Sequence, residues 1–239
     1  MKHFLNIELP AVTLPVAGTD SVFPVRRIYC VGRNYAAHAR EMGKDPTREP
    51  PFFFMKPATS LVVVDGAEVE IPYPSQTKNY QHEIELVAAI GSRADNVSVE
   101  QALRHVCGYA VGLDMTRRDL QFAARDAGRP WEMGKSFAYS APAGPLQDAR
   151  ELGHPTRGAI TLTVNGEERQ RADLSDLIWS VAECISHLSA LDALEPGDLL
   201  FTGTPAGVGA VVAGDRLRGS IEGIGDIQVR VGVAKESAA

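Results

Sequence analysis

The chain has 239 residues, and its 24 basic and 30 acidic side chains give a formal net charge of −6. This length suits one substantial domain with enough core to fold without disulfides. The acidic balance and the dispersed arginines argue against a nucleic-acid surface. The sequence shows no apolar run long enough to cross a bilayer and no signal-peptide pattern, and its three cysteines lack metal-ligand spacing. We therefore expect a cytoplasmic protein with a small-molecule partner and no membrane or nucleic-acid partner.

Residues 1–24 are rich in proline, which opposes helix, and we expect them to form an extended N-terminal arm. The remaining residues, 25–239, are expected to form one folded domain. Its first predicted elements are a short buried strand over residues 27–31, a turn at Gly32 and a helix that ends near Gly43.

His38 and Glu41 lie three residues apart on that predicted helix, so their side chains are neighbours on its surface. A carboxylate beside an imidazole fixes the imidazole tautomer and raises its basicity, which suits removal of a proton from water. An exposed ion pair of little energetic value is the alternative. No serine or cysteine lies in a recognisable nucleophile motif, so water is the expected attacking group.

Short strands are predicted at residues 52–56, 61–64 and 67–72, and the run HEIELVAAIG (82–91) predicts a buried strand. Because side chains alternate along a strand, Glu83 and Glu85 share one face. Two like charges in a core are costly, and a bound divalent cation is the usual compensation. Oxygen ligands favour Mg²⁺ or Mn²⁺ over zinc. An edge strand with a solvated acidic face is the alternative.

The next strand candidate, over residues 107–114, ends at Asp114 and leads into a helix that Pro130 stops. An acid where a buried strand gives way to a helix is a common metal-ligand position. Asp114 is by itself an equally good helix N-cap. Together with Glu83 and Glu85, however, it completes a ligand count that suits Mg²⁺.

Arg118 and Gln121 share a face of this helix because they lie three residues apart. Lys135 follows in the segment WEMGKSF, where an unpaired ammonium would be poorly solvated. Cationic and amide donors beside a metal would bind an anionic substrate that the metal also chelates. A set of surface salt bridges among the neighbouring arginines and aspartates is the alternative.

The rest of the chain predicts further strands and one clear amphipathic helix. Residues 159–170 predict a hairpin with a type I′ turn at Asn165 and Gly166, residues 174–191 predict the helix, and 198–205 predict a strand and turn. Two strands around Gly223 and Gly225 close the chain. Strands outnumber helices and alternate with them irregularly, which favours a mixed α+β, strand-rich architecture over a doubly wound sheet.

Seven motifs, in this order, closely resemble those of the fumarylacetoacetate hydrolase family: VGRNYAAHAREMG, PFFFMKP, YQHEIELVAAIG, GLDMTRRDLQ, GKSF, LTVNGEERQ and PGDLLFTGTPAGVG. The resemblance is to the acylpyruvate and fumarylpyruvate hydrolase branch and spans about residues 25–233. It implies a fumarylacetoacetate hydrolase-type β-roll with flanking helices, a homodimer, and a catalytic domain over 25–239. It also implies Mg²⁺ or Mn²⁺ held by Glu83, Glu85 and Asp114.

The resemblance also implies roles for the other residues. His38 and Glu41 match the dyad that activates water, and Arg118, Gln121 and Lys135 match positions that hold the acylpyruvate. Lys135 would also stabilise or protonate the pyruvate enolate. The positions of Lys56 and Thr204 line the same pocket in the family.

The N-terminal segment is most similar to bacterial fumarylpyruvate hydrolases of gentisate breakdown, which implies cleavage of 3-fumarylpyruvate to fumarate and pyruvate. Arg33 is then the expected partner of the distal carboxylate. A general acylpyruvase, an oxaloacetate decarboxylase and a 2-oxo-diacid isomerase on the same fold are the alternatives, because they use the same metal and pyruvate contacts. A non-catalytic metal-binding paralogue is a more distant one.

Overall fold

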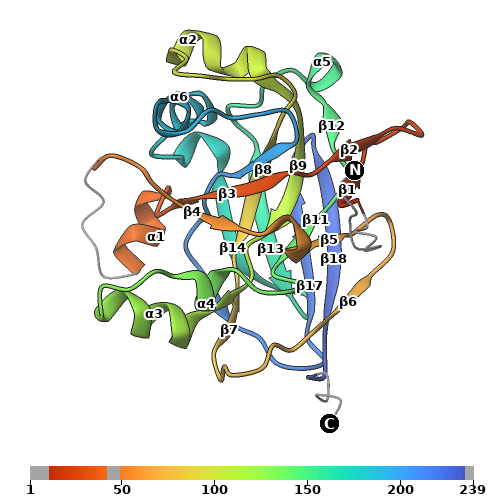
Figure 1. Cartoon of the computed structure of the whole chain (residues 1–239). Coiled ribbons are helices and arrows are strands. Elements are labelled where there is room, and N and C mark those ends of the chain that lie inside the picture. Colours follow the sequence, from red (N-terminus) through yellow and green to blue (C-terminus); the bar gives the residue numbers. More distant parts are fainter. Residues whose placement is uncertain (1–10, 42–48, 235–239) are drawn as a thin grey trace, which may run out of the picture.

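The computed structural model describes residues 11–41 and 49–234. Its main layer is an eight-stranded, curled sheet in the order β4-β3-β15-β8-β9-β11-β5, with β12 paired to β9 (Figure 1). The strands are β3 (Arg27–Gly32), β4 (Phe52–Lys56), β5 (Leu61–Val63), β8 (Ile84–Ile90), β9 (Val106–Leu113), β11 (Ala141–Ala143), β12 (Gln147–Asp148) and β15 (Asp198–Phe201).

A second sheet has five strands in the order β14-β13-β17-β18-β6, and a small third sheet has the order β10-β7-β16. Their strands are β6 (Val69–Pro72), β7 (Tyr80–His82), β10 (Thr116–Arg117), β13 (Ala159–Val164), β14 (Glu167–Asp173), β16 (Gly209–Ala210), β17 (Arg216–Ile221) and β18 (Gly225–Gly232). The strand-rich α+β architecture expected from the sequence is confirmed.

The helices are short and lie around the sheets. They are α1 (Ala36–Glu41), α2 (Val99–Ala102), α3 (Arg118–Asp126), α4 (Glu132–Lys135), α5 (Ala149–Leu152) and α6 (Val181–Leu191), with 3₁₀ turns at Ala58–Ser60, Leu103–His105 and Leu174–Asp176. Figure 1 shows α2 and α6 together at one end of the molecule and α3 and α4 together at another. Within the described residues no helix is both long and apolar enough to span a membrane.

Strand β8 lies at the centre of the fold and is buried at every position. Its side chains alternate between two cores: Leu86 and Ala88 pack in the larger one, whereas Val87 and Ala89 pack in a smaller one with Phe201. Burial on both faces explains why this segment reads as a continuous apolar run. A carboxylate in such a strand has no solvent to face, so the solvated-edge interpretation of Glu85 is wrong.

The strand predicted over residues 82–91 is interrupted at Glu83, because the chain changes sheets there. β7 ends at His82 and pairs with β10 and β16, whereas β8 starts at Ile84 and pairs with β9 and β15. The Asp114 N–H donates to the Glu83 carbonyl over 2.8 Å, which ties the break to the end of β9. Strict side-chain alternation therefore does not hold between Glu83 and Glu85, although both carboxylates still reach one site.

The amphipathic helix predicted over 174–191 begins later than expected, at Val181. Residues before it form a 3₁₀ turn and a loop, and a capping box between Ser180 and Glu183 fixes the start. The predicted hairpin turn is confirmed: Asn165 and Gly166 both have positive φ, 53° and 83°, as a type I′ turn requires.

The described part of the predicted N-terminal arm forms a small hairpin, β1 (Thr13–Pro15) with β2 (Val22–Pro24). Leu14 is fully buried, and with Phe23 it packs on the smaller core. Residues 1–10 lie outside the described residues, as do residues 42–48, where the helix of α1 was expected to end. The division into an arm and a domain at residue 24 stays a prediction.

Candidate active site

Three buried carboxylates meet where the large sheet joins the small one. Glu83 lies at the break between β7 and β8, Glu85 lies in β8, and Asp114 directly follows β9. β8 and β9 are antiparallel neighbours, with Glu85 opposite Gly112, and this pairing brings the three side chains together. One ligand oxygen from each lies within 4.8 Å of the others, and no residue of the three is more than 4% exposed.

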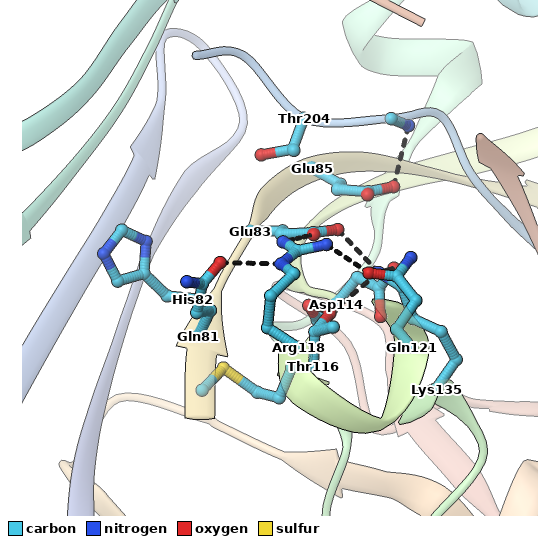
Figure 2. A network of polar contacts seen from close by, with 12 residues as sticks. Gln81, His82, Glu83, Glu85, Asp114, Thr116, Arg118, Gln121, Lys135 and Thr204 are labelled. Carbon is cyan, nitrogen blue, oxygen red and sulfur yellow. Dashed lines mark hydrogen bonds and ion pairs between the residues drawn. The ribbon is translucent and has the colours of Figure 1, made fainter. Parts of the chain in front are cut away.

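Cations from two other segments contact these carboxylates (Figure 2). The ammonium of Lys135 donates to Glu83 Oε2 over 2.7 Å, to Asp114 Oδ2 over 2.6 Å and to Thr116 Oγ1 over 2.7 Å, so all three of its N–H groups are used. The guanidinium of Arg118 contacts Glu83 Oε1. Its N–H groups also donate to the side-chain oxygens of Gln121 and Gln81.

The charges on the two glutamates are not balanced equally. Burial opposes ionisation of Glu83, but Lys135 and Arg118 outweigh it and hold the pKa of that carboxyl well below its usual range. Burial raises the pKa of Glu85 well above its usual range, and the charges of Asp114 and Glu83 raise it further. Glu85 Oε2 accepts a hydrogen bond of 2.7 Å from Gly203 N–H, which is weak compensation for a buried charge.

The uncompensated charge of Glu85 indicates that a metal ion suits the site. Glu85 is buried among like charges and lacks a cationic partner among the described residues, whereas a divalent ion would neutralise it. All three donors are hard carboxylate oxygens, the type that Mg²⁺ and Mn²⁺ prefer. Glu83, Glu85 and Asp114 therefore fit such an ion.

His38 of α1 lines the same cavity as Glu83 and Glu85, and Glu41 of the same helix supports it from outside the cavity lining. His38 Nδ1 lies 3.1 Å from Glu41 Oε2, and the Gly207 N–H donates to both Glu41 oxygens over 3.1 and 3.2 Å. Burial opposes ionisation of Glu41, but these hydrogen bonds from His38 and Gly207 outweigh it and lower its pKa. With Nδ1 donating to an ionised Glu41, His38 Nε2 is left to accept a proton.

The cavity has a volume of about 130 Å³, which suits a small molecule. Most of the site residues expected from the sequence line it: Arg33, His38, Glu83, Glu85, Arg118, Gln121, Lys135 and Thr204. Aromatic rings and a further cation complete the wall, from Phe122, Trp131 and Arg125. Side chains from α1, β8, α3, α4 and the loop after β15 thus converge on one chamber.

Lys56 occupies a different place from the pocket wall expected for it. It is 1% exposed and is not among the residues lining the cavity. Its ammonium lies 2.8 Å from Asp114 Oδ1, donates to Ser140 Oγ over 3.1 Å and contacts the Lys135 carbonyl. Lys56 therefore supports Asp114 and Lys135 by direct contact.

Arg33 lines the cavity with positive φ, 55°, and its guanidinium is 4.7 Å from the centre of the Phe52 ring. Among the described residues it has no carboxylate partner. Phe52 in turn packs edge-on against Trp131, with ring centres 5.3 Å apart. An arginine held on an aromatic ring and facing a cavity is available to an anionic ligand.

Several supporting residues were not identified from the sequence. The Gln81 side-chain oxygen accepts from the Arg118 Nε–H over 2.7 Å. The backbone N–H groups of Gly207 and Gly203 donate to the carboxylates of Glu41 and Glu85, respectively. Gln81 and the two glycines lie inside the motifs YQHEIELVAAIG and PGDLLFTGTPAGVG, so the motif boundaries were the available signal. Their partners lie far away in sequence and could be identified only from the fold.

Comparison with known proteins adds independent information. The family description "Fumarylacetoacetate (FAA) hydrolase C-terminal" matches residues 27–232. The chain is 60% identical to fumarylpyruvate hydrolase from Pseudomonas aeruginosa, whose crystal structure in complex with Mn²⁺ and pyruvate superposes with a TM-score of 0.95 and covers 97% of this chain and 100% of that one.

Two further relatives define the range of activities nearby. A fumarylpyruvate hydrolase from Ralstonia sp is 47% identical over 191 residues, which is 80% of this chain and 97% of that protein. A mitochondrial oxaloacetate tautomerase from Bos taurus is 39% identical over 206 residues, 86% of this chain and 91% of that protein.

Proposed function

We propose that this chain, which belongs to the fumarylacetoacetate hydrolase family, is a Mg²⁺- or Mn²⁺-dependent hydrolase that cleaves the carbon–carbon bond of a 3-acylpyruvate. The proposed substrate is 3-fumarylpyruvate, and the products are fumarate and pyruvate. The observation that carries this proposal is one cavity lined by Glu83 and Glu85 of the carboxylate cluster, by His38 of the His–Glu dyad and by three arginines. Similarity to two fumarylpyruvate hydrolases supports the choice of substrate.

In this proposal Glu83, Glu85 and Asp114 hold the divalent ion. When bound, the ion supplies Lewis acidity that stabilises negative charge on the 2-oxo group of the leaving pyruvate, an effect of roughly several kcal/mol. The protein supplies the remaining groups, and each has a defined place in the structure.

His38 is the proposed general base. Its Nδ1 is engaged by Glu41, so Nε2 removes a proton from water as the oxygen attacks the acyl carbonyl carbon. The bond between that carbon and the pyruvate methylene then breaks, and the electron pair passes to the pyruvate enolate. A positioned base of this kind contributes roughly 10²- to 10⁴-fold.

Arg118 and Gln121 are proposed to hold the pyruvate carboxylate. Arg118 uses three of its N–H groups on protein oxygens, which leaves two of its five for a ligand. Gln121 accepts from Arg118 through Oε1, so its amide N–H groups are available as donors. Thr204 lies on the same cavity wall and is proposed as a further contact.

Lys135 is proposed to stabilise the charge of the pyruvate enolate or to protonate the enolate carbon. Burial opposes its charged form, but Asp114 and Glu83 outweigh burial and raise its pKa, so the ammonium is retained. Lys56 is proposed to orient Asp114 rather than to touch the substrate, because its ammonium lies outside the cavity wall.

Arg33 is proposed to receive the distal carboxylate of the fumaryl group. It lines the cavity, and its cation is held on Phe52 without a carboxylate partner among the described residues. We further propose that the enzyme is a cytoplasmic homodimer that acts in gentisate breakdown, which gel filtration and growth on gentisate of a deletion strain would test.

A second candidate is interconversion of the keto and enol forms of oxaloacetate, supported by the 39% identity to a mitochondrial oxaloacetate tautomerase. Product analysis separates the two. Purified Mn²⁺-loaded protein is offered 3-fumarylpyruvate, acetylpyruvate and oxaloacetate in parallel. Our proposal predicts stoichiometric fumarate and pyruvate from the first. Rapid oxaloacetate tautomerisation or decarboxylation without cleavage of either acylpyruvate would contradict it.

A further inference from the structure

Gln170 is a fully buried amide on β14 that connects three segments of the active-site wall. Its Oε1 accepts from the Ile84 N–H over 3.1 Å and lies 2.9 Å from His82 Nδ1. Its Nε2 donates to the Pro205 carbonyl and to Thr204 Oγ1, each over 2.8 Å. None of the proposed chemical steps uses this residue.

Two backbone partners determine which way the amide faces. A backbone N–H such as that of Ile84 can only donate, so it requires the oxygen of Gln170 on its side. A backbone carbonyl such as that of Pro205 can only accept, so it requires the amide nitrogen. The opposite orientation would place like groups against each other at both ends in a buried site.

This orientation determines the proton positions on two neighbouring side chains. His82 meets an oxygen that can only accept, so its Nδ1 carries a proton. Thr204 meets an N–H that can only donate, so its Oγ1 accepts, and its own hydroxyl proton must point elsewhere.

Thr204 lines the cavity together with Glu83, Glu85 and Lys135. Among the described residues its hydroxyl donates to no protein acceptor, although the side chain is only 2% exposed. A hydroxyl whose acceptor side is occupied and whose donor side is free is suited to an anionic oxygen in the cavity.

We propose that Gln170 is a positioning residue that holds the Thr204 hydroxyl as a hydrogen-bond donor to the 2-oxo acid bound in the cavity. The inference rests on the proposed function only in that the ligand is a 2-oxo acid, for which pyruvate is the probe. A hydrogen bond to a charged group contributes enough that its loss weakens binding about tenfold.

The test measures pyruvate affinity by calorimetry on Mn²⁺-loaded protein. In Gln170→Glu an oxygen replaces the amide nitrogen and draws the Thr204 proton away from the cavity, and in Gln170→Met no donor remains. Both variants should bind pyruvate about tenfold more weakly, as should Thr204→Val. Thr204→Ser keeps the hydroxyl and should stay within about twofold of wild type.

A double variant separates positioning of the Thr204 hydroxyl by Gln170 from general disruption of the site. If Gln170 acts through Thr204, the two losses of pyruvate affinity should not add. The double variant of Thr204→Val with Gln170→Met should then bind pyruvate no more weakly than whichever single variant has the lower pyruvate affinity. Mn²⁺ affinity should be unchanged in all of them, because no metal ligand is altered, whereas a damaged site would lose both. Additive losses, or wild-type pyruvate affinity in both Gln170 variants, would overturn the inference.

A measurement on the wild type keeps the inference testable if the Gln170 variants do not fold. Nitrogen NMR of ¹⁵N-histidine-labelled protein should show His82 protonated at Nδ1, and a tautomer protonated only at Nε2 would refute the amide orientation. Failure of the wild type to bind pyruvate would count against the proposed function, whereas binding that ignores Gln170 would count against this inference alone.

Discussion

The carboxylate site and a cluster around Asp198, both within residues 11–41 and 49–234, differ in how completely their buried charges are matched. Around Asp198, at the start of β15, one carboxylate accepts from Arg27 over 3.0 and 2.6 Å and from the Glu195 N–H over 2.8 Å. Arg26 lies 3.4 Å from the same carboxylate. Every oxygen of Asp198 is therefore paired, and none of its partners lines the active-site cavity.

At the carboxylate site the opposite holds. Glu85 is as deeply buried as Asp198, but its neighbours are two further carboxylates and its pKa is raised. The site opens to a cavity, and the Asp198 cluster does not. Burial of a charge alone therefore does not identify a functional site. A buried charge without a balancing partner beside a cavity is the better indicator.

The largest effect is expected for Glu85→Ala. Removing this carboxylate leaves two ligands for the ion, so turnover of 3-fumarylpyruvate should fall below detection, while circular dichroism should show a folded protein. Asp198→Asn is the matched control, because it removes an equally buried charge outside the cavity. Its kcat under folded conditions should stay within about threefold of wild type. Comparable turnover in the two variants would remove the functional distinction between the clusters.

His38→Ala should lower kcat by at least about 10²-fold, because the general base is lost while the carboxylates remain. Mn²⁺ binding should persist in this variant. Near-normal cleavage of an acylpyruvate would show that His38 is not the base and would favour the tautomerase candidate.

Arg33→Ala should reduce kcat/KM for 3-fumarylpyruvate at least about tenfold more than for acetylpyruvate, since only the former has a distal carboxylate to pair. Arg125→Ala is a useful comparison, because Arg125 lines the same cavity but contacts Asp126 over 2.8 Å. Equal losses on both substrates in Arg33→Ala would assign that arginine a structural role.

The smallest effects concern the stability of the fold. Neutralising Asp198 should lower the stability, whereas neutralising Glu85 should raise it. Asp198→Asn should destabilise the fold by about 1–3 kcal/mol, a discounted value because Arg27 is partly exposed. Glu85→Gln should raise the melting temperature of the metal-free protein, because ionised Glu85 is destabilising there.

The pH dependence follows from the raised pKa of Glu85. The unfolded chain loses this proton near the usual value of 4.5, whereas the folded, metal-free protein loses it at higher pH. Stability is therefore lost as pH rises through that interval, and the advantage of Glu85→Gln over wild type should widen with pH. A constant difference in melting temperature from pH 4.5 upward would contradict the assigned imbalance.

The sequence was informative where a pattern is local. Alternation and turn residues identified most strands, the i,i+3 spacing placed His38 beside Glu41, and the ordered motifs identified the family correctly. Local patterns failed at Glu83, where the chain changes sheets, and at the start of α6, where a cap rather than periodicity sets the boundary.

Long-range contacts could not be predicted in this way. Gln170 is distant in sequence from His82 and Thr204, and only the packing of β14 against the loop after β15 brings them together. The motif of Lys56 did not indicate that its ammonium, at the end of β4, contacts Asp114. Which side chain points into a cavity depends on the sheet, which no single motif encodes.

The most direct test of the central claim is a Mn²⁺ titration by calorimetry of wild type, Glu85→Gln and His38→Ala. We expect one ion per chain in the wild type and in His38→Ala, and a loss of Mn²⁺ affinity of at least about 10²-fold in Glu85→Gln. Wild-type Mn²⁺ affinity in Glu85→Gln would contradict the assignment of Glu83, Glu85 and Asp114 as the metal site.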